Sequence, residues 1–499
     1  MSNIRVTYSG LIGFVVSIVS VLTGIMFTII VTRRLSPEEF GIWAIIGSML
    51  AYFLIAEPII SYWSTRQIAR GEPTGKTSLF SSTMFSFGAI PVYLILAYFV
   101  SSVSSEHLDF LLLGAVLLPV MFVSQTLVSI NLAHKPHATS FGLLGFESIK
   151  IPVGLALVYF LDLGVSGAIL ATLVAFIGKI VIQLYFAQPK LKDKFSIQIF
   201  RRWIKLSWIP LYGNIGSFIW SLDIVLFSII TGSLVGVAYY GVSIAISSVI
   251  GHAGMISQAI YPKLLAEQKS EFIQENFSRL LYFAIPLLGF TIIFSKSALF
   301  ILNPVYIIAS TVVILLSFRT FFYVINGVFY KILLGVETVD VEKNPTFSKL
   351  VKSKLIQVPT IINIHYGLYI GILVSVLLLI HSTNMSELDL IIIWSTISVA
   401  LQIPFCIYIF ILVQKSVNLS IPFVDISKYV IGTIGFVIVF LLTSESIIKF
   451  EISIYDFLPG FITQSIICIG VYMGITYLID KKTRTLFKSI FYELISKVK

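Results

Sequence analysis

The chain is a series of long apolar stretches separated by short polar segments. Fourteen of these stretches have roughly the 20 residues that a helix needs to cross a membrane. They cover approximately 8–31, 42–63, 79–102, 109–131, 141–161, 166–187, 209–231, 237–260, 281–302, 308–331, 362–382, 388–413, 428–446 and 457–479. The pattern therefore predicts an all-α polytopic membrane protein with about 14 transmembrane helices.

The composition supports this class and excludes others. Of 499 residues, 57% are hydrophobic and only 12% are charged, which is about half the charged share of a soluble domain. A soluble core also stops growing at about 250–300 residues. Cys406 and Cys468 both lie in apolar stretches, so they are expected to be small buried hydrophobes and not a disulfide framework.

The basic residues predict the orientation of the chain. If both termini are cytoplasmic, 27 of the 34 Lys and Arg residues fall in cytoplasmic segments and four fall inside spans. Only Arg33, Arg34 and Lys449 are then outside. This is the expected bias for a multi-pass protein of the cytoplasmic membrane. It also accounts for the net charge of +10 without a nucleic-acid partner.

The polar segments suggest five parts. The first six spans form an N-lobe, 1–187, and the next six form a C-lobe, 209–413. The basic linker 188–208 has apolar residues at nearly helical spacing, so we expect an amphipathic helix that contacts anionic headgroups at the cytoplasmic surface. Two further spans occupy 414–479, and a basic cytoplasmic tail covers 480–499.

Two short motifs predict local backbone features. Ser36-Pro37-Glu38-Glu39 is typical of a helix N-terminus, because Ser can cap, Pro suits the first turn and acids favour the positive end of the dipole. Gly41 follows and suits close helix packing. Glu57-Pro58 predicts a kink within the second span.

Several motifs, in this order and spacing, resemble a known family. They are VTRRLSPEEFGIWAII at 31–46, STRQIARGE at 64–72, LDLGVSGAILAT at 161–172, SLDIVLFSIITG at 221–232 and AIYPKL at 259–264. Together they resemble the polysaccharide and lipid-linked oligosaccharide flippases, which include the O-antigen flippases, of the multidrug/oligosaccharidyl-lipid/polysaccharide exporter superfamily. The resemblance implies two six-helix lobes around a central cavity, two additional C-terminal helices and transport by alternating access.

Arg319 is the first candidate for contact with the cargo. It lies near the middle of span 308–331, and Tyr323, Asn326 and Tyr330 follow at helical spacing on the same face. Arg suits a diphosphate because its planar fork binds oxyanions at two points. The amide and the phenols suit sugar hydroxyls. The alternative is a structural pair between helices, for instance with Asp223.

Asp223 lies on a second stripe, with Tyr212, Gly216 and Trp220 at helical spacing in span 209–231. The resemblance implies an acidic residue in this part of the family. Asp223 and Trp220 are candidates for sugar contact, and Asp223 is also a candidate for coupling to a proton or another cation. A structural role for Asp223 has equal weight.

Glu147 and Lys150 form a third candidate group. They lie three residues apart in span 141–161, so they either neutralise one another or line the cavity, where Lys150 would add a cation for phosphate. Arg66 and Arg70 lie four residues apart at the cytoplasmic end of span 42–63. We expect both to contact lipid headgroups, with a lipid diphosphate as the alternative.

The sequence contains no phosphate-binding loop of an ATPase and no metal-ligand or nucleophile motif, so we expect no cofactor, no metal and no enzyme activity. The expected cargo is a lipid-linked oligosaccharide or polysaccharide precursor, with membrane lipids and glycan-biosynthesis enzymes as partners. Two alternatives stay open. One is a drug or metabolite antiporter of the same superfamily, coupled to H+ or Na+, and the other is a membrane-embedded glycan polymerase or ligase.

Overall fold

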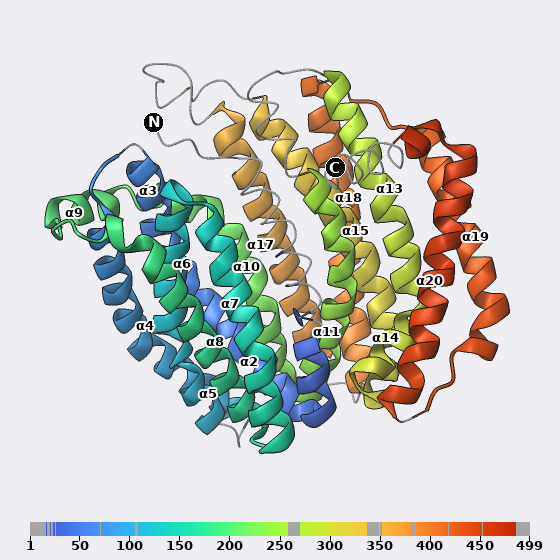
Figure 1. Ribbon diagram of the computed structural model, residues 1–499, viewed down its shortest axis with the longest axis horizontal. Coiled ribbons are helices and arrows are strands. Elements are labelled where there is room, and N and C mark those ends of the chain that lie inside the picture. Colours follow the sequence, from blue (N-terminus) through green and yellow to red (C-terminus); the bar gives the residue numbers. More distant parts are fainter. Residues whose placement is uncertain are drawn as a thin grey trace, which may run out of the picture. The chain divides into compact units, whose positions relative to one another are not determined.

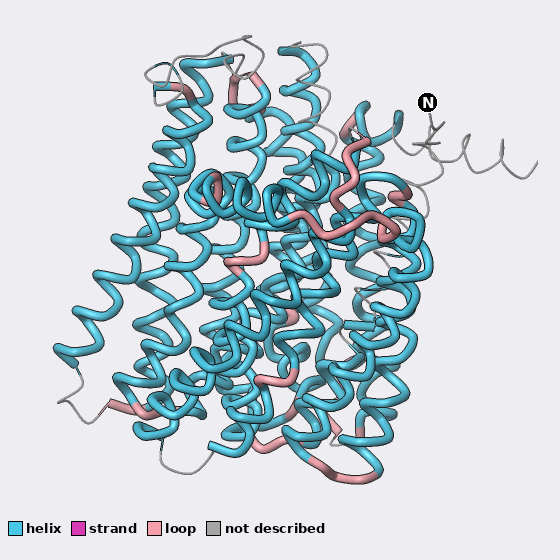
Figure 2. Tube along the Cα trace, turned by 90° about the vertical axis from the view of Figure 1, so that its left-hand side faces the viewer, coloured by secondary structure: helices cyan, strands magenta, loops and turns pink. Residues whose placement is uncertain are grey.

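The computed structural model describes 16, 20, 23–24, 26–69, 71–104, 108–257, 270–336, 349, 352–380, 385–417, 419–451 and 453–485. Within these ranges the chain consists of helices and loops and contains no strand (Figure 2). In these ranges, twelve helices are long and apolar enough to cross a membrane, and the pair α2 and α3, bent by 55° at its break, makes a thirteenth if it is counted as one span. The predicted first span, 8–31, lies largely outside the described residues. The all-α multi-pass class is therefore confirmed.

The helices follow the order of the apolar stretches (Figure 1). The earlier ones are α2 (Pro37–Leu54), α3 (Pro58–Ala69), α4 (Gly75–Ser104), α5 (Leu108–Gly114), α6 (Leu117–His134), α7 (His137–Gly154), α8 (Gly164–Ala187), α9 (Ile197–Lys205), α10 (Trp208–Thr231) and α11 (Leu234–Ser247). The later ones are α13 (Ser270–Ile293), α14 (Ser295–Leu302), α15 (Ser310–Gly335), α17 (Lys354–Ile380), α18 (Glu387–Val417), α19 (Phe423–Ile447) and α20 (Ile454–Ile479).

The chain divides into two compact units. Unit 1 comprises Met1–Ala238 and Ile362–Glu387, and unit 2 comprises Tyr239–Ile361 and Leu388–Lys499. This division groups α10 and most of α17 with the N-terminal helices, whereas the sequence assigned both spans to a C-lobe. The N-lobe 1–187 and the C-lobe 209–413 stay a prediction about which helices move together during transport.

The start of α2 shows how local sequence sets a helix end. The Ser36 side chain accepts a hydrogen bond from the Glu39 backbone N–H, and the Glu39 carboxylate accepts one from the Ser36 N–H, at 3.2 and 2.8 Å. Pro37 occupies the first turn. This capping box satisfies two backbone donors that a helix start would otherwise leave open, so the predicted N-terminus is confirmed.

The predicted linker helix is α9, and it packs against other helices of unit 1. Trp203 is buried and donates its indole N–H to Gln67 Oε1 at 3.0 Å. Ser196 accepts a hydrogen bond from the Ile199 N–H at the helix start. Arg201, Arg202 and Lys205 are exposed. Trp203 therefore anchors α9 on the protein, while Ile197, Ile204 and the basic residues are exposed and available to the membrane surface.

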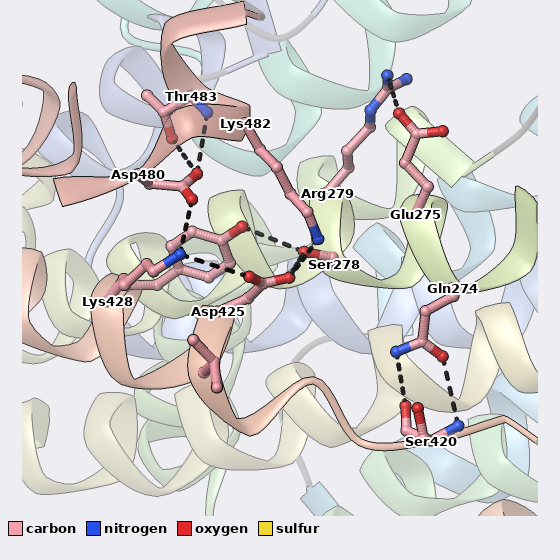
Figure 3. Close-up of polar contacts among 12 residues, drawn as sticks. Gln274, Glu275, Ser278, Arg279, Ser420, Asp425, Lys428, Asp480, Lys482 and Thr483 are labelled. Atoms are coloured by element: carbon pink, nitrogen blue, oxygen red, sulfur yellow. Dashed lines mark hydrogen bonds and ion pairs between the residues drawn. The ribbon is translucent and has the colours of Figure 1, made fainter. Parts of the chain in front are cut away.

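In unit 2, the two C-terminal helices are held at both ends by different chemistry. At one end, Phe450 and Phe457 pack around Phe300 of α14, with ring centroids 5.2 and 4.7 Å away. The other end is a polar cluster that joins α13, α19 and the segment after α20 (Figure 3). Figure 1 shows α19 and α20 lying beside one another.

Two carboxylates organise the polar cluster. Asp425 accepts hydrogen bonds from Ser278 and Lys482, both at 2.6 Å. Asp480 accepts from Lys428 at 3.0 Å and from the backbone N–H and hydroxyl of Thr483, both at 2.9 Å. Burial by itself raises the pKa of Asp480, but the donors from Lys428 and Thr483 outweigh it and lower that pKa.

Packing of α2 generates the first prediction. A Cβ atom on Gly41 would overlap the backbone carbonyl of Leu234, whereas a Cβ on Gly47 of the same helix would meet no atom within 4 Å. Gly41→Ala should therefore destabilise the fold by about 1–3 kcal/mol. Gly47→Ala should leave it unchanged or raise its stability by up to about 1 kcal/mol. Thermal unfolding in detergent measures both, and equal melting temperatures for the two variants would refute the close packing.

The polar cluster generates the second prediction. Because the folded pKa of Asp480 lies below its unfolded value, its contribution is present above the unfolded pKa and is lost as pH falls through the folded pKa. Asp480→Asn should therefore cost about 2 kcal/mol at neutral pH and progressively less in acid. Asp456→Asn, at an exposed position at the other end of α20, is the control. Unfolding scans over a pH series measure the difference, and a cost that does not depend on pH would contradict the assignment.

Candidate functional site

The predicted stripe on α10 lies on one face, and that face packs against α17 within unit 1. The Asn363 side chain donates to the Tyr212 carbonyl at 3.4 Å. A Cβ on Gly216 would touch Asn363 and Tyr366, so the glycine allows the helices to approach closely. The Trp220 ring stacks on Tyr366 with centroids 5.7 Å apart and planes 7° apart. The stripe is therefore a packing surface in this conformation.

Asp223 lies at the end of this stripe and is buried. Its Oδ2 accepts a hydrogen bond from the Tyr369 hydroxyl at 2.9 Å, and its Oδ1 accepts from the Ile224 backbone N–H at 2.8 Å. Nearby on α10, the Ser221 carbonyl accepts from the hydroxyls of Ser48 and Tyr52 of α2, at 2.8 and 2.7 Å. A single turn of α10 thus bonds to hydroxyl groups on two other helices.

Arg319 is placed by α15 in unit 2 and is 9% exposed. One guanidinium N–H donates to the Tyr240 hydroxyl of α11 at 3.4 Å. The Tyr240 ring stacks on Trp394 of α18, with centroids 3.5 Å apart, and both rings are fully buried. A rigid aromatic pair therefore fixes the hydroxyl that contacts the guanidinium.

The other members of the α15 stripe differ in accessibility. Tyr323 is 44% exposed. Asn326 is 1% exposed, and neither its amide nitrogen nor its amide oxygen has a hydrogen-bond partner among the described residues. Tyr330 packs against Phe405 with ring centroids 6.4 Å apart. The face that the sequence predicted as one surface therefore contains an exposed phenol and an enclosed amide.

Glu147 and Lys150 form an ion pair, with Nζ 2.9 Å from Oε2. The Glu147 carboxylate also accepts hydrogen bonds from Ser20 at 2.7 Å and from Thr23 at 2.8 Å. The Lys150 ammonium lies 4.9 Å from the centre of the Phe146 ring. The alternative of mutual neutralisation is thus confirmed, and a role of Lys150 in binding phosphate stays a prediction.

The predicted headgroup contacts are only partly described. Arg66 is exposed at the end of α3, and its guanidinium lies 4.5 Å from the centre of the Tyr62 ring. This position suits contact with a headgroup. Arg70 lies outside the described residues.

Sequence reasoning missed the partners of the candidate residues and one polar cavity. Asn363, Tyr366 and Tyr369 recur every three residues in an apolar span, a helical-face signal that could have suggested a partner for the α10 stripe. In unit 2, a cavity of about 560 Å³ lies beside the polar cluster and is lined by Gln274, Arg279 and Tyr282, among others. In the described part of the chain, no group of three or more His, Cys, Asp or Glu side chains is arranged to hold a metal ion.

The fold is similar to that of solved transporters. It resembles a lipid II flippase, MurJ, in an inward closed conformation, with a TM-score of 0.67 at 16% identity over 95% of this chain and 99% of that chain. It also resembles a multidrug resistance MATE family transporter of the MOP superfamily. The inward-facing form gives a TM-score of 0.58 at 12% identity over 81% of this chain and 96% of that one, and the outward-facing form gives 0.57 at 14% over 83% and 95%.

No protein-family model matches this sequence, and no curated protein sequence matches it either. The likeness to solved structures therefore establishes the fold and not the cargo. The chain is a multi-pass membrane protein with the fold of MOP-superfamily transporters.

Proposed function

We propose that the chain is a flippase that moves a lipid-linked oligosaccharide or polysaccharide precursor across the cytoplasmic membrane by alternating access. The observation that carries the proposal is Arg319, an arginine buried in a membrane-spanning helix and fixed by an aromatic pair. A charge at this depth costs roughly 2.5–3.5 kcal/mol on insertion scales. A buried charge with this cost is usually present because it serves a function. The fold likeness to a lipid II flippase supports this cargo class.

The chemistry of Arg319 suits a diphosphate. Guanidinium carries five N–H donors in a rigid plane, and the Tyr240 hydroxyl accepts from one of them. Two-point bonding to a phosphate is geometrically selective in a way that a lysine ammonium is not. Tyr240, held against Trp394, orients the plane before the cargo arrives and so reduces the entropy lost on binding.

Asn326 supports a second conformation. An enclosed amide without a hydrogen-bond partner in the described part of the chain costs about 1–3 kcal/mol in this conformation. Any conformation that hydrates this amide, or gives it a sugar hydroxyl, recovers that free energy. We therefore assign Asn326 and the accessible Tyr323 to sugar contact, together with Trp220 once it leaves its stack on Tyr366.

The remaining candidates take secondary roles in the proposal. Lys150 is neutralised by Glu147, so it contributes to phosphate binding only if that pair separates. Arg66, with Arg70, attracts the anionic headgroup at the cytoplasmic face. The sidedness, with both termini cytoplasmic, follows from the bias of basic residues. Membrane lipids and glycan-biosynthesis enzymes are the proposed partners.

The second candidate function is a drug or metabolite antiporter coupled to H+ or Na+. Asp223 favours it, because a buried carboxylate that bonds to a tyrosine hydroxyl is a group that can exchange a cation. The likeness to MATE transporters fits this alternative as well. The cation of Arg319 attracts the diphosphate of a lipid-linked glycan but repels a cationic drug, so substitution of Arg319 separates the two functions.

Arg319→Ala should abolish flipping of a lipid-linked glycan, and Arg319→Lys should reduce it at least tenfold, because an ammonium cannot form the two-point bond. Tyr240→Phe should leave measurable flipping but reduce it by roughly ten- to hundredfold, since one hydrogen bond to a charged group is worth about 1.5–3 kcal/mol. The measurement is the rate at which a fluorescently labelled lipid-linked oligosaccharide is flipped in proteoliposomes that contain the purified protein.

Lys296→Ala is the control, since Lys296 is an exposed cation at the break between α13 and α14. It should flip the probe at the parental rate. Parental flipping by Arg319→Ala at equal protein levels would overturn the proposal. Cation uptake driven by a drug gradient in the same vesicles, without flipping, would establish the antiporter instead. A change in the length of the glycan would indicate an enzyme.

A further inference from the structure

Glu57 lies at the break between α2 and α3 in unit 1 and is 6% exposed. Its carboxylate accepts a hydrogen bond from the Thr126 hydroxyl of α6 at 3.3 Å. The Ser61 hydroxyl, one turn further along α3, lies near the same carboxylate. The carboxyl group therefore links the residue at the bend to a third helix.

No cation pairs with this carboxylate in the described part of the chain. The described charged side chains and histidines on helices that pack against α2 and α3 are Lys76 of α4, Asp109 of α5, His134 of α6, Lys179 of α8, Arg201, Arg202 and Lys205 of α9, and Asp223 of α10. The tyrosines on the same helices are Tyr93 and Tyr98 of α4, Tyr185 of α8 and Tyr212 of α10. None of them forms an ion pair or hydrogen bond with Glu57. Two hydroxyl groups only partly offset the loss of water around a negative charge.

Glu147 provides an internal comparison. It lies in the same unit, it is 4% exposed, and it accepts hydrogen bonds from the hydroxyl groups of Ser20 and Thr23. It differs in having Lys150 at 2.9 Å. Glu57 has no such cation among the described residues, so the two buried carboxyl groups differ in their nearest charged neighbour.

The backbone at Glu57 is a point where the helix can change direction. Pro58 has no N–H and so cannot continue the helical hydrogen-bond ladder across the break. Ala56 and Glu57 donate to Phe53 and Leu54, three residues back, at 3.2 and 3.1 Å. An apolar cavity of about 330 Å³, lined by Phe53, Ala56 and Phe122 among others, gives the bend space to move.

We propose that Glu57 is a proton-binding site that controls the bend between α2 and α3. When it is ionised, the carboxylate accepts a hydrogen bond from the Thr126 hydroxyl, and the Ser61 hydroxyl lies nearby. When one proton from water adds to a carboxylate oxygen, the neutral acid donates its own O–H to one of these hydroxyls, which then turns its hydrogen to another acceptor. The restraint between the bend and α6 changes accordingly. Proton binding at Glu57 does not depend on whether the cargo is a lipid-linked glycan.

Infrared difference spectroscopy of the purified protein in nanodiscs tests proton binding directly. Between about pH 5 and about pH 9, the parent should lose the C=O band of a protonated carboxylic acid. Glu57→Gln should lack this band, and Glu147→Gln, the matched control, should retain it. A parent without a titrating band, or a band that persists in Glu57→Gln, would overturn the assignment.

Distances between spin labels test control of the bend. Gly47 and Ala69 are exposed positions on α2 and α3, and the native Cys406 and Cys468 are first replaced because labels require a unique cysteine pair. The distance between labels at the two positions should change across the same pH range in the parent and in Glu147→Gln, and stay constant in Glu57→Gln. An equal change in Glu57→Gln, or no change in the parent, would refute the coupling. Flipping assays are not needed, so failure of the proposed cargo leaves this test intact.

Discussion

The absence of water within a membrane is the constraint on which this structure depends. A polar group buried among apolar helices must find its partner in the protein. Asp223 bonds to Tyr369, Arg319 to Tyr240, and Glu147 to Lys150. Each of these partners comes from the same compact unit. The polar contacts therefore help to make each unit a body that can move as a whole.

The sequence was most informative where a feature is local. The capping box at Ser36, the break at Glu57-Pro58 and the pair Glu147–Lys150 involve residues at most three apart. Side-chain spacing alone decides such features. The membrane spans could be predicted equally well, because a run of apolar residues identifies a span whatever helices it packs against.

Contacts between distant segments could not be predicted in the same way. α10 and α17 are separated by more than a hundred residues, and both stripes are helical faces that could pack against many apolar helices. Nothing in the sequence selects Tyr240 and Trp394 as the support for Arg319. The candidate residues could be chosen because charge is rare in a membrane, but their surroundings require three-dimensional packing.

The two ends of the α19–α20 pair have a consequence for how unit 2 comes apart. Phenylalanine rings secure one end, and hydrogen-bonded charges secure the other. Detergent competes with aromatic packing, whereas acid removes the carboxylate charge. Different solvents should therefore loosen opposite ends of the same helical hairpin, so that the first segment to become accessible to protease reports which kind of force has failed.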